Sequence, residues 1–165
     1  MRRRSLPRRF WPLIMLIVAL ALAGRLGIFR LLDSDGRYTV ERVVDGDTIL
    51  LAGGDRVRYI GVNTPESVQP GRPVECYGRE AAQKNKELVQ GKRVALERDV
   101  SDRDSFGRLL RYVYVDGLFV NGELVKSGYA KAARYPPDTK HHETFVALQE
   151  EAKRDNLGLW GACAR

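Results

Sequence analysis

The sequence predicts an α+β domain built around a small five-stranded β-barrel with three helices, preceded by an N-terminal hydrophobic segment. Three observations lead to this fold class. Short runs rich in Val, Leu, Ile and Tyr alternate with Gly and Asp turns, as in a series of antiparallel strands. Residues 77–91 and 141–156 instead carry apolar residues at helical spacing. The first 32 residues combine an arginine-rich start with a long apolar run.

The N-terminal segment, residues 1–32, predicts export. Five arginines within the first nine residues precede the apolar run, and the first acidic residue is Asp33. Residues 21–23, Ala-Leu-Ala, are small enough for the cleavage site of a signal peptide. An uncleaved anchor over residues 11–32 reaches the length of about 20 residues that a membrane span needs. Length therefore favours an anchor in the membrane over a cleaved signal, and either places the domain outside the cytoplasm, in the cell envelope of a bacterium.

The rest of the chain divides into a polar linker at 33–36, a folded domain at 37–161 and a C-terminal tail at 162–165. The formal net charge is +7, from 28 basic and 21 acidic residues. Without the five N-terminal arginines, 23 basic residues face the 21 acidic ones. Because the domain is nearly neutral, its net charge does not identify a nucleic-acid partner, and any basic footprint has to be local.

The barrel strands follow in order along the domain. We expect them at 37–44, 48–51, 56–62, 92–100 and 109–115, with a short stub at 118–120 and Gly-containing turns between most of them. Helices are expected at 77–91, 121–127 and 141–156, the last with Asp138 or Thr139 as its N-cap. Five strands with a helix between the third and the fourth is the order of an OB-fold barrel.

A charged site is predicted where the third strand ends. The run 57–66 begins as a strand that carries Arg58 and turns at Pro65, which cannot continue strand pairing. Oxygen donors gather at this turn, because a neighbouring strand supplies Asp47 and the turn itself supplies Asn63, Thr64 and Glu66. Such oxygens suit a hard cation, and an arginine beside them suits an anion.

These segments, taken together, resemble the staphylococcal nuclease (thermonuclease) family along nearly all of residues 37–161. The matching pieces are Val-Asp-Gly-Asp-Thr at 44–48, Arg58, Thr-Pro-Glu at 64–66, Tyr-Gly-Arg-Glu-Ala at 77–81, Asp-Ser-Phe-Gly-Arg at 104–108, 120–125 and 158–160. Each piece alone is weak, but seven in the same order are specific. The resemblance implies an OB fold and hydrolysis of DNA and RNA at the 5′ P–O bond, which leaves 3′-phosphate ends.

The resemblance also implies a Ca²⁺ site. The family's ligands match Asp47, position 63 and the backbone carbonyl of Thr64, and its glutamate at the position of Glu66 orients the attacking water. Position 63 is an aspartate in the family and Asn63 here. An amide oxygen still binds Ca²⁺, but one negative charge is lost and the affinity should fall.

The phosphate-binding residues implied by the resemblance are Arg58 and Arg108. Two arginines suit the spread negative charge of a phosphoryl transition state, although a solvated surface position is the alternative for any one of 28 basic residues. Phe106 and Tyr135 are candidates for stacking on bases, with ordinary packing as the alternative.

The cysteines and histidines complete the set of chemically active residues. Cys76 and Cys163 are the only thiols and lack the spacing of a zinc site; in an oxidising exported location they are expected to pair as a disulfide. His141 and His142 are neighbours on a helix and cannot face one ligand together. The favoured function is a metal-dependent nuclease acting as a monomer, and the alternative is a catalytically silent OB-fold module that binds nucleic acid or protein.

Overall fold

The computed structural model describes residues 36–67, 71 and 73–163. The predicted N-terminal segment 1–32 lies outside the described residues, as do all of the linker except Gly36 and the last two residues of the tail. No helix within the described part of the chain is long and apolar enough to cross a membrane.

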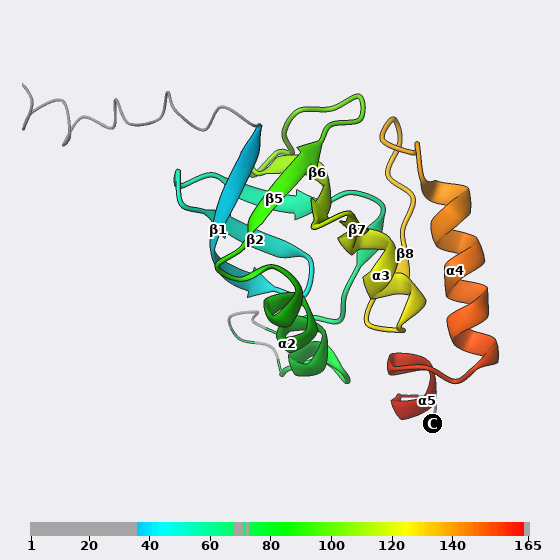
Figure 1. Ribbon diagram of the computed structural model, residues 1–165. Coiled ribbons are helices and arrows are strands. Elements are labelled where there is room, and N and C mark those ends of the chain that lie inside the picture. Colours follow the sequence, from blue (N-terminus) through cyan, green and yellow to red (C-terminus); the bar gives the residue numbers. More distant parts are fainter. Residues whose placement is uncertain (1–35, 68–70, 72, 164–165) are drawn as a thin grey trace, which may run out of the picture. The chain divides into compact units, whose positions relative to one another are not determined.

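Five strands close into a barrel, as the sequence predicted (Figure 1). They are β1 (Arg37–Asp45), β2 (Thr48–Leu51), β3 (Arg56–Tyr59), β5 (Arg93–Glu97) and β6 (Leu109–Val115). β1 is antiparallel to both β2 and β5, and β5 is antiparallel to β6. The barrel closes where β3 pairs in parallel with β6, with Val57 opposite Leu109.

Shorter elements complete the domain. β7 (Leu118–Phe119) pairs with β6, and β4 (Val62–Asn63) pairs with β8 (Lys131–Ala132). The helices are α2 (Gly78–Val89), α3 (Val120–Lys126), α4 (His142–Arg154) and α5 (Leu159–Ala162). The first three are the predicted helices: α2 and α4 are slightly shorter than expected, and α3 begins and ends one residue earlier. β8 and α5 were not predicted, and α5 extends one residue into the expected tail.

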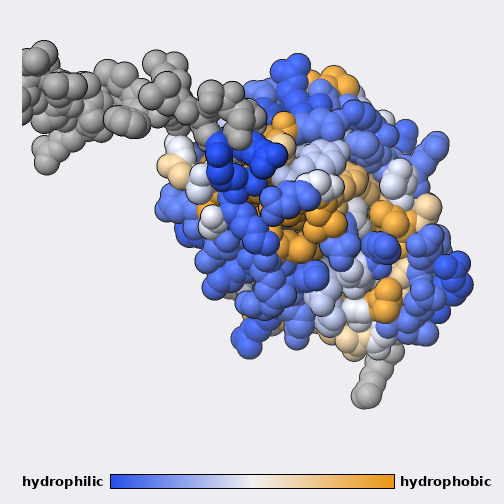
Figure 2. All heavy atoms as spheres, viewed as in Figure 1, coloured by the Kyte–Doolittle hydropathy of each residue, from blue (hydrophilic) through white to orange (hydrophobic). Residues whose placement is uncertain are grey.

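The core is formed by the inward side chains of the barrel strands. Val40, Ile49, Val57, Val94 and Val113 are fully buried. Burying one such side chain contributes about 1.5–3 kcal/mol relative to leaving it exposed. On the face seen in Figure 2, hydrophilic side chains cover most of the molecule and apolar ones appear only as small patches. The apolar residues of the strands therefore lie mainly inside the barrel.

The predicted third strand, 56–62, is interrupted in the structure. β3 ends at Tyr59, and β4 begins only at Val62. Gly61 between them has a φ of +76°, and a Cβ at this position would lie 2.4 Å from the ring of Phe145 on α4. Because only glycine allows both this backbone and this packing, the chain turns here instead of continuing the strand.

The predicted cap of the last helix is wrong. α4 follows His141, and no side chain caps its first turn. The carboxylate of Asp138 instead accepts hydrogen bonds from the backbone N–H groups of Val100 and Ser101, at 3.0 and 2.8 Å. Asp138 is buried, and it ties the loop before α4 to the loop after β5.

A disulfide joins Cys76 to Cys163, with an S–S distance of 2.07 Å. It connects the segment before α2 to the residue after α5, across a sequence separation of 87 residues. Closing a loop of this length stabilises the folded state by about 4 kcal/mol in the chain-entropy model. The segment that it fixes follows directly on the predicted site.

Candidate active site

Asp47 lies in the tight turn between β1 and β2, and its backbone is fixed on both sides. Its N–H donates to a carboxylate oxygen of Asp45 at 3.0 Å, and its carbonyl accepts the N–H of Tyr59 at 2.9 Å. A Cβ on Gly46 would lie 2.6 Å from the hydroxyl oxygen of Thr64. The Asp45-Gly46 turn therefore packs directly against the segment that follows β4.

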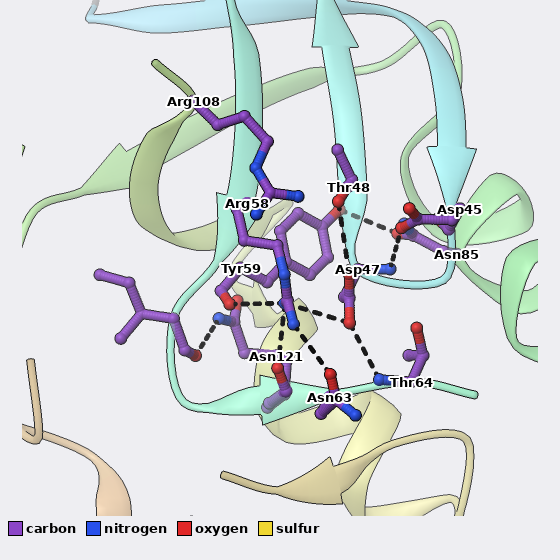
Figure 3. A network of polar contacts seen from close by, with 12 residues as sticks. Asp45, Asp47, Thr48, Arg58, Tyr59, Asn63, Thr64, Asn85, Arg108 and Asn121 are labelled. Carbon is purple, nitrogen blue, oxygen red and sulfur yellow. Dashed lines mark hydrogen bonds and ion pairs between the residues drawn. The ribbon is translucent and has the colours of Figure 1, made fainter. Parts of the chain in front are cut away.

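The carboxylate of Asp47 is the buried centre of the site (Figure 3). One oxygen accepts the backbone N–H of Thr64 at 2.9 Å and forms an ion pair with Arg58 at 3.0 Å. The other oxygen accepts the hydroxyl of Thr48 at 3.3 Å. Burial raises the pKa of Asp47 to about 6, although the Arg58 guanidinium opposes the shift. This carboxyl therefore changes charge close to neutral pH.

Arg58 on β3 holds the turn at the end of its own strand. One of its terminal nitrogens donates to the backbone carbonyls of Tyr59 and Val62, both at 3.0 Å. The other donates to the side-chain oxygen of Asn63 at 3.1 Å. The guanidinium thus bridges Asp47, the interrupted strand and Asn63, and its side chain is only 13% exposed.

Two buried asparagines that the sequence did not single out support this arrangement (Figure 3). Asn121 on α3 donates to the carbonyl of Ile60 at 3.0 Å and accepts the N–H of Val113 at 2.9 Å. Asn85 on α2 accepts the hydroxyl of Tyr59 at 2.8 Å and donates to the carbonyl of Asp45 at 3.1 Å. A buried polar group left without its partner costs about 1–3 kcal/mol, so both asparagines fix the strand ends that carry Arg58 and Asp47.

Arg108 is held by the loop that precedes β6. Its Nε donates to Asp104 at 2.7 Å, and the other oxygen of Asp104 accepts the N–H groups of Phe106 and Arg108, both at 3.0 Å. Partial burial opposes ionisation of Asp104, but these bonds keep its pKa below the usual value. The loop is therefore ordered around one carboxylate, and Asp104 positions Arg108.

One cavity of about 400 Å³ brings four predicted residues together. Arg58, Arg108, Phe106 and Tyr135 all line it, although they come from three separate parts of the chain. Phe106 is 83% exposed and Tyr135 is 54% exposed, so neither side chain belongs to the core. Two cations and two exposed rings around one cavity suit a ligand that combines phosphate with an aromatic base.

Glu66 does not line this cavity, and its backbone is closely held. Its N–H donates to the Glu75 carboxylate at 3.1 Å, and its carbonyl accepts the N–H of Glu75 at 2.9 Å. A Cβ on Gly78 would lie 2.5 Å from the same carbonyl. The Glu66 side chain is exposed, and within the described residues no hydrogen bond or ion pair joins its carboxylate to Asp47 or Asn63. Segment 75–78 thus fixes the position from which Glu66 projects.

The predicted metal ligands fit a hard cation by the chemistry of their donors. Asp47, Asn63 and Thr64 are neighbours and offer carboxylate, amide and backbone oxygens. Among the described residues, no group of three or more His, Cys, Asp or Glu side chains is arranged for a metal. Arg58 bonds to both Asp47 and Asn63, so a cation would compete with Arg58 for these oxygens.

Comparison with known proteins finds relatives over most of the chain. The family described as staphylococcal nuclease homologue matches residues 56–162. A thermonuclease of Staphylococcus intermedius is 37% identical over 87% of this chain and 95% of its own length. The endonuclease YncB of Bacillus subtilis is 46% identical over 74% of this chain, which spans 60% of that relative. A thermonuclease of Staphylococcus hyicus is 38% identical over 74% of this chain and 75% of its own length.

Proposed function

This chain belongs to the staphylococcal nuclease family, and we propose that it is a metal-dependent nuclease that hydrolyses phosphodiester bonds in DNA and RNA. The observation that carries the proposal is the shared cavity of Arg58, Arg108, Phe106 and Tyr135 beside the oxygen donors around Asp47. The thermonuclease and endonuclease names of the relatives support the same class of reaction.

In this proposal the two arginines bind the scissile phosphate. Arg58 presents a guanidinium that is already fixed by the strand, and Arg108 adds a second one from the loop. Donors that are fixed before the reaction stabilise the charge that builds up on the phosphoryl oxygens, because they need no reorganisation during the step. Phe106 and Tyr135 stack on neighbouring bases.

Glu66 is the proposed acceptor of the proton from the attacking water. The water oxygen bonds to phosphorus while the P–O5′ bond breaks and the departing oxygen takes a proton from solvent, which leaves a 3′-phosphate and a 5′-hydroxyl. The hold of Glu75 and Gly78 on the Glu66 backbone supports this role, because a base has to be kept within reach of its water.

Asp47, Asn63 and the carbonyl of Thr64 are the proposed ligands of a divalent cation, with Ca²⁺ as the ion that the oxygen donors favour. A bound cation would neutralise negative charge on the phosphate. Asn63 supplies no charge, so we expect this site to need more Ca²⁺ than one with an aspartate there.

The test is cleavage of single-stranded DNA and of RNA by the protein, in Ca²⁺ and in excess chelator. We expect cleavage only with Ca²⁺ and products whose 3′ ends carry a phosphate that a phosphatase removes. The alternative, a silent OB-fold module, is favoured only by Asn63. It predicts that the protein binds the oligonucleotide but leaves it intact at every Ca²⁺ concentration, a result that would exclude the nuclease.

A further inference from the structure

A second cavity, of about 190 Å³, lies beside Asn63. Its lining includes Asn63, Pro65, Glu75, Lys131 and the bonded pair Cys76 and Cys163. It shares no lining residue with the cavity of Arg58, Arg108, Phe106 and Tyr135. The two cavities are adjacent nonetheless, because Arg58 lines the first, Asn63 lines the second, and the two side chains are hydrogen-bonded at 3.1 Å.

Lys131 is the cation of this second cavity. β8 places it directly across the ladder from Asn63 on β4. Its side chain is exposed, and within the described part of the chain it makes no hydrogen bond or ion pair. Among the described residues that line the cavity, Glu75 is the only one with a carboxylate, and this carboxylate already accepts the N–H of Glu66. The lysine charge is therefore available to a ligand.

The walls of this cavity suit a sugar–phosphate backbone rather than a base. None of the described residues that line it is aromatic, in contrast to the cavity with Phe106 and Tyr135. The disulfide and the β4–β8 ladder contribute to its walls. Contacts to phosphate position a strand without reading its sequence.

A strand that is cut internally continues on both sides of the scissile phosphate. The first cavity accommodates one side. We propose that the Lys131 cavity is a second strand subsite, which binds the backbone phosphate on the opposite side of the scissile bond. This inference rests on the proposed nuclease function and adds to it a preference for longer strands.

The test compares two series of single-stranded oligonucleotides with the full protein. Both start from one dinucleotide, and one series is extended only on the 5′ side while the other is extended only on the 3′ side. The variants are Lys131→Gln, Lys131→Arg and a control, Lys126→Gln, which removes an exposed charge from α3 outside both cavities. The measured quantities are kcat and KM at several salt concentrations.

We expect Lys131→Gln to raise KM about tenfold for one series only, with kcat nearly unchanged. The slope of log KM against log salt should fall by about 0.7 for that series, the value for one lost contact to a single strand. The dinucleotide should be unaffected, and Lys131→Arg should restore binding.

The inference is overturned if Lys131→Gln and Lys126→Gln give the same KM and salt slope with every substrate. It is also overturned if the loss is equal for the dinucleotide and for both series, because the effect then has nothing to do with strand length. In either case wild-type cleavage leaves the proposed function intact. Absence of cleavage by the wild type would instead remove the proposed function, and this subsite with it.

Discussion

The two arginines of the site face one cavity but are held in different ways. Arg58 belongs to a barrel strand, is 13% exposed, and bonds to Asp47, to two backbone carbonyls and to Asn63. Arg108 belongs to a loop, is 28% exposed, and within the described residues has Asp104 as its one ion-pair partner. In the proposed mechanism Arg58 therefore serves both the fold and the ligand, whereas Arg108 serves the ligand alone.

The largest expected effect is a loss of activity, and it should be similar for the two arginines. Arg58→Ala and Arg108→Ala should each lower kcat by about 10²–10³, the loss seen when one donor to a charged transition state is removed. The double variant should lose less than the product of the two, because both act on the same phosphate. Steady-state cleavage of single-stranded DNA at saturating Ca²⁺ measures this.

A matched control comes from the same loop. Arg103 pairs with Asp55 at 3.1 Å, donates to the carbonyl of Gly107 at 2.7 Å and does not line the cavity. If the Arg108 guanidinium itself is what the reaction needs, Arg103→Ala should retain wild-type kcat. Equal losses for Arg103→Ala and Arg108→Ala would mean that the cleavage depends on the order of the loop and not on the guanidinium.

The loss of folding stability should differ between the alanine variants of the two arginines. Arg58→Ala leaves the Asp47 carboxylate buried without its cation, so the free energy of unfolding should fall by about 3 kcal/mol. Arg108→Ala exposes Asp104 to solvent and should cost less than about 1 kcal/mol. Urea unfolding at pH 7 without metal measures both. Adding Asp47→Asn to Arg58→Ala should recover part of the loss, and equal losses for the two arginines would contradict the comparison.

The pH dependence of Ca²⁺ binding should come from Asp47, the buried carboxyl of the site. Burial raises the pKa of Asp47 to about 6. Below that pH a proton competes with the cation, so the half-saturating Ca²⁺ concentration should rise about tenfold per pH unit. Because the folded pKa lies above the unfolded value, the contribution of Asp47 to stability is present at acid pH and is lost as the pH rises through about 6. Calcium titrations at pH 5, 6 and 7 test this, and a constant half-saturation would contradict it.

Removing an exposed aromatic ring should give the smallest effect. Phe106 and Tyr135 lie outside the regular strands and helices, as Arg108 does, so their loss should change substrate binding and not stability. Phe106→Ala and Tyr135→Ala should each raise KM about fivefold, the lower end of what one stacked base contributes. Both should leave the unfolding free energy unchanged, because neither ring is packed in the core. Urea unfolding and KM for an oligothymidylate measure the two quantities, and a stability loss without a change in KM would assign these rings to packing.

The sequence predicted the parts of the molecule that repeat a pattern. The five barrel strands and three longer helices carry apolar residues at regular spacing, and Arg58 and Asp47 could be assigned to strand ends for that reason. The ladder of β4 and β8 has two residues in each strand, too few for any period to appear. The bond from Asn121 to the carbonyl of Ile60 spans 61 residues, and nothing local to either residue indicates it.

For some supporting residues the sequence gives only a weak indication of their role. Asn85 stands among apolar positions of α2, where a polar residue indicates a buried partner. Glu75 ends a Pro- and Gly-containing loop whose sequence gives it no particular role, yet its carboxylate accepts the N–H of Glu66. The pairing partners of such residues depend on tertiary packing, which the sequence pattern does not contain.

The most direct test of the nuclease site is a Ca²⁺ titration of cleavage by the wild type, Glu66→Gln and Asn63→Asp on single-stranded DNA. Glu66→Gln keeps the shape and removes the base, so the rate at saturating Ca²⁺ should fall about 10²–10³-fold. Asn63→Asp restores a ligand charge, so half-saturation should move to lower Ca²⁺ with little change in the saturated rate. If Glu66→Gln cleaves as fast as the wild type at saturating Ca²⁺, and Asn63→Asp does not shift the titration, the reaction takes place elsewhere and the proposed site is wrong.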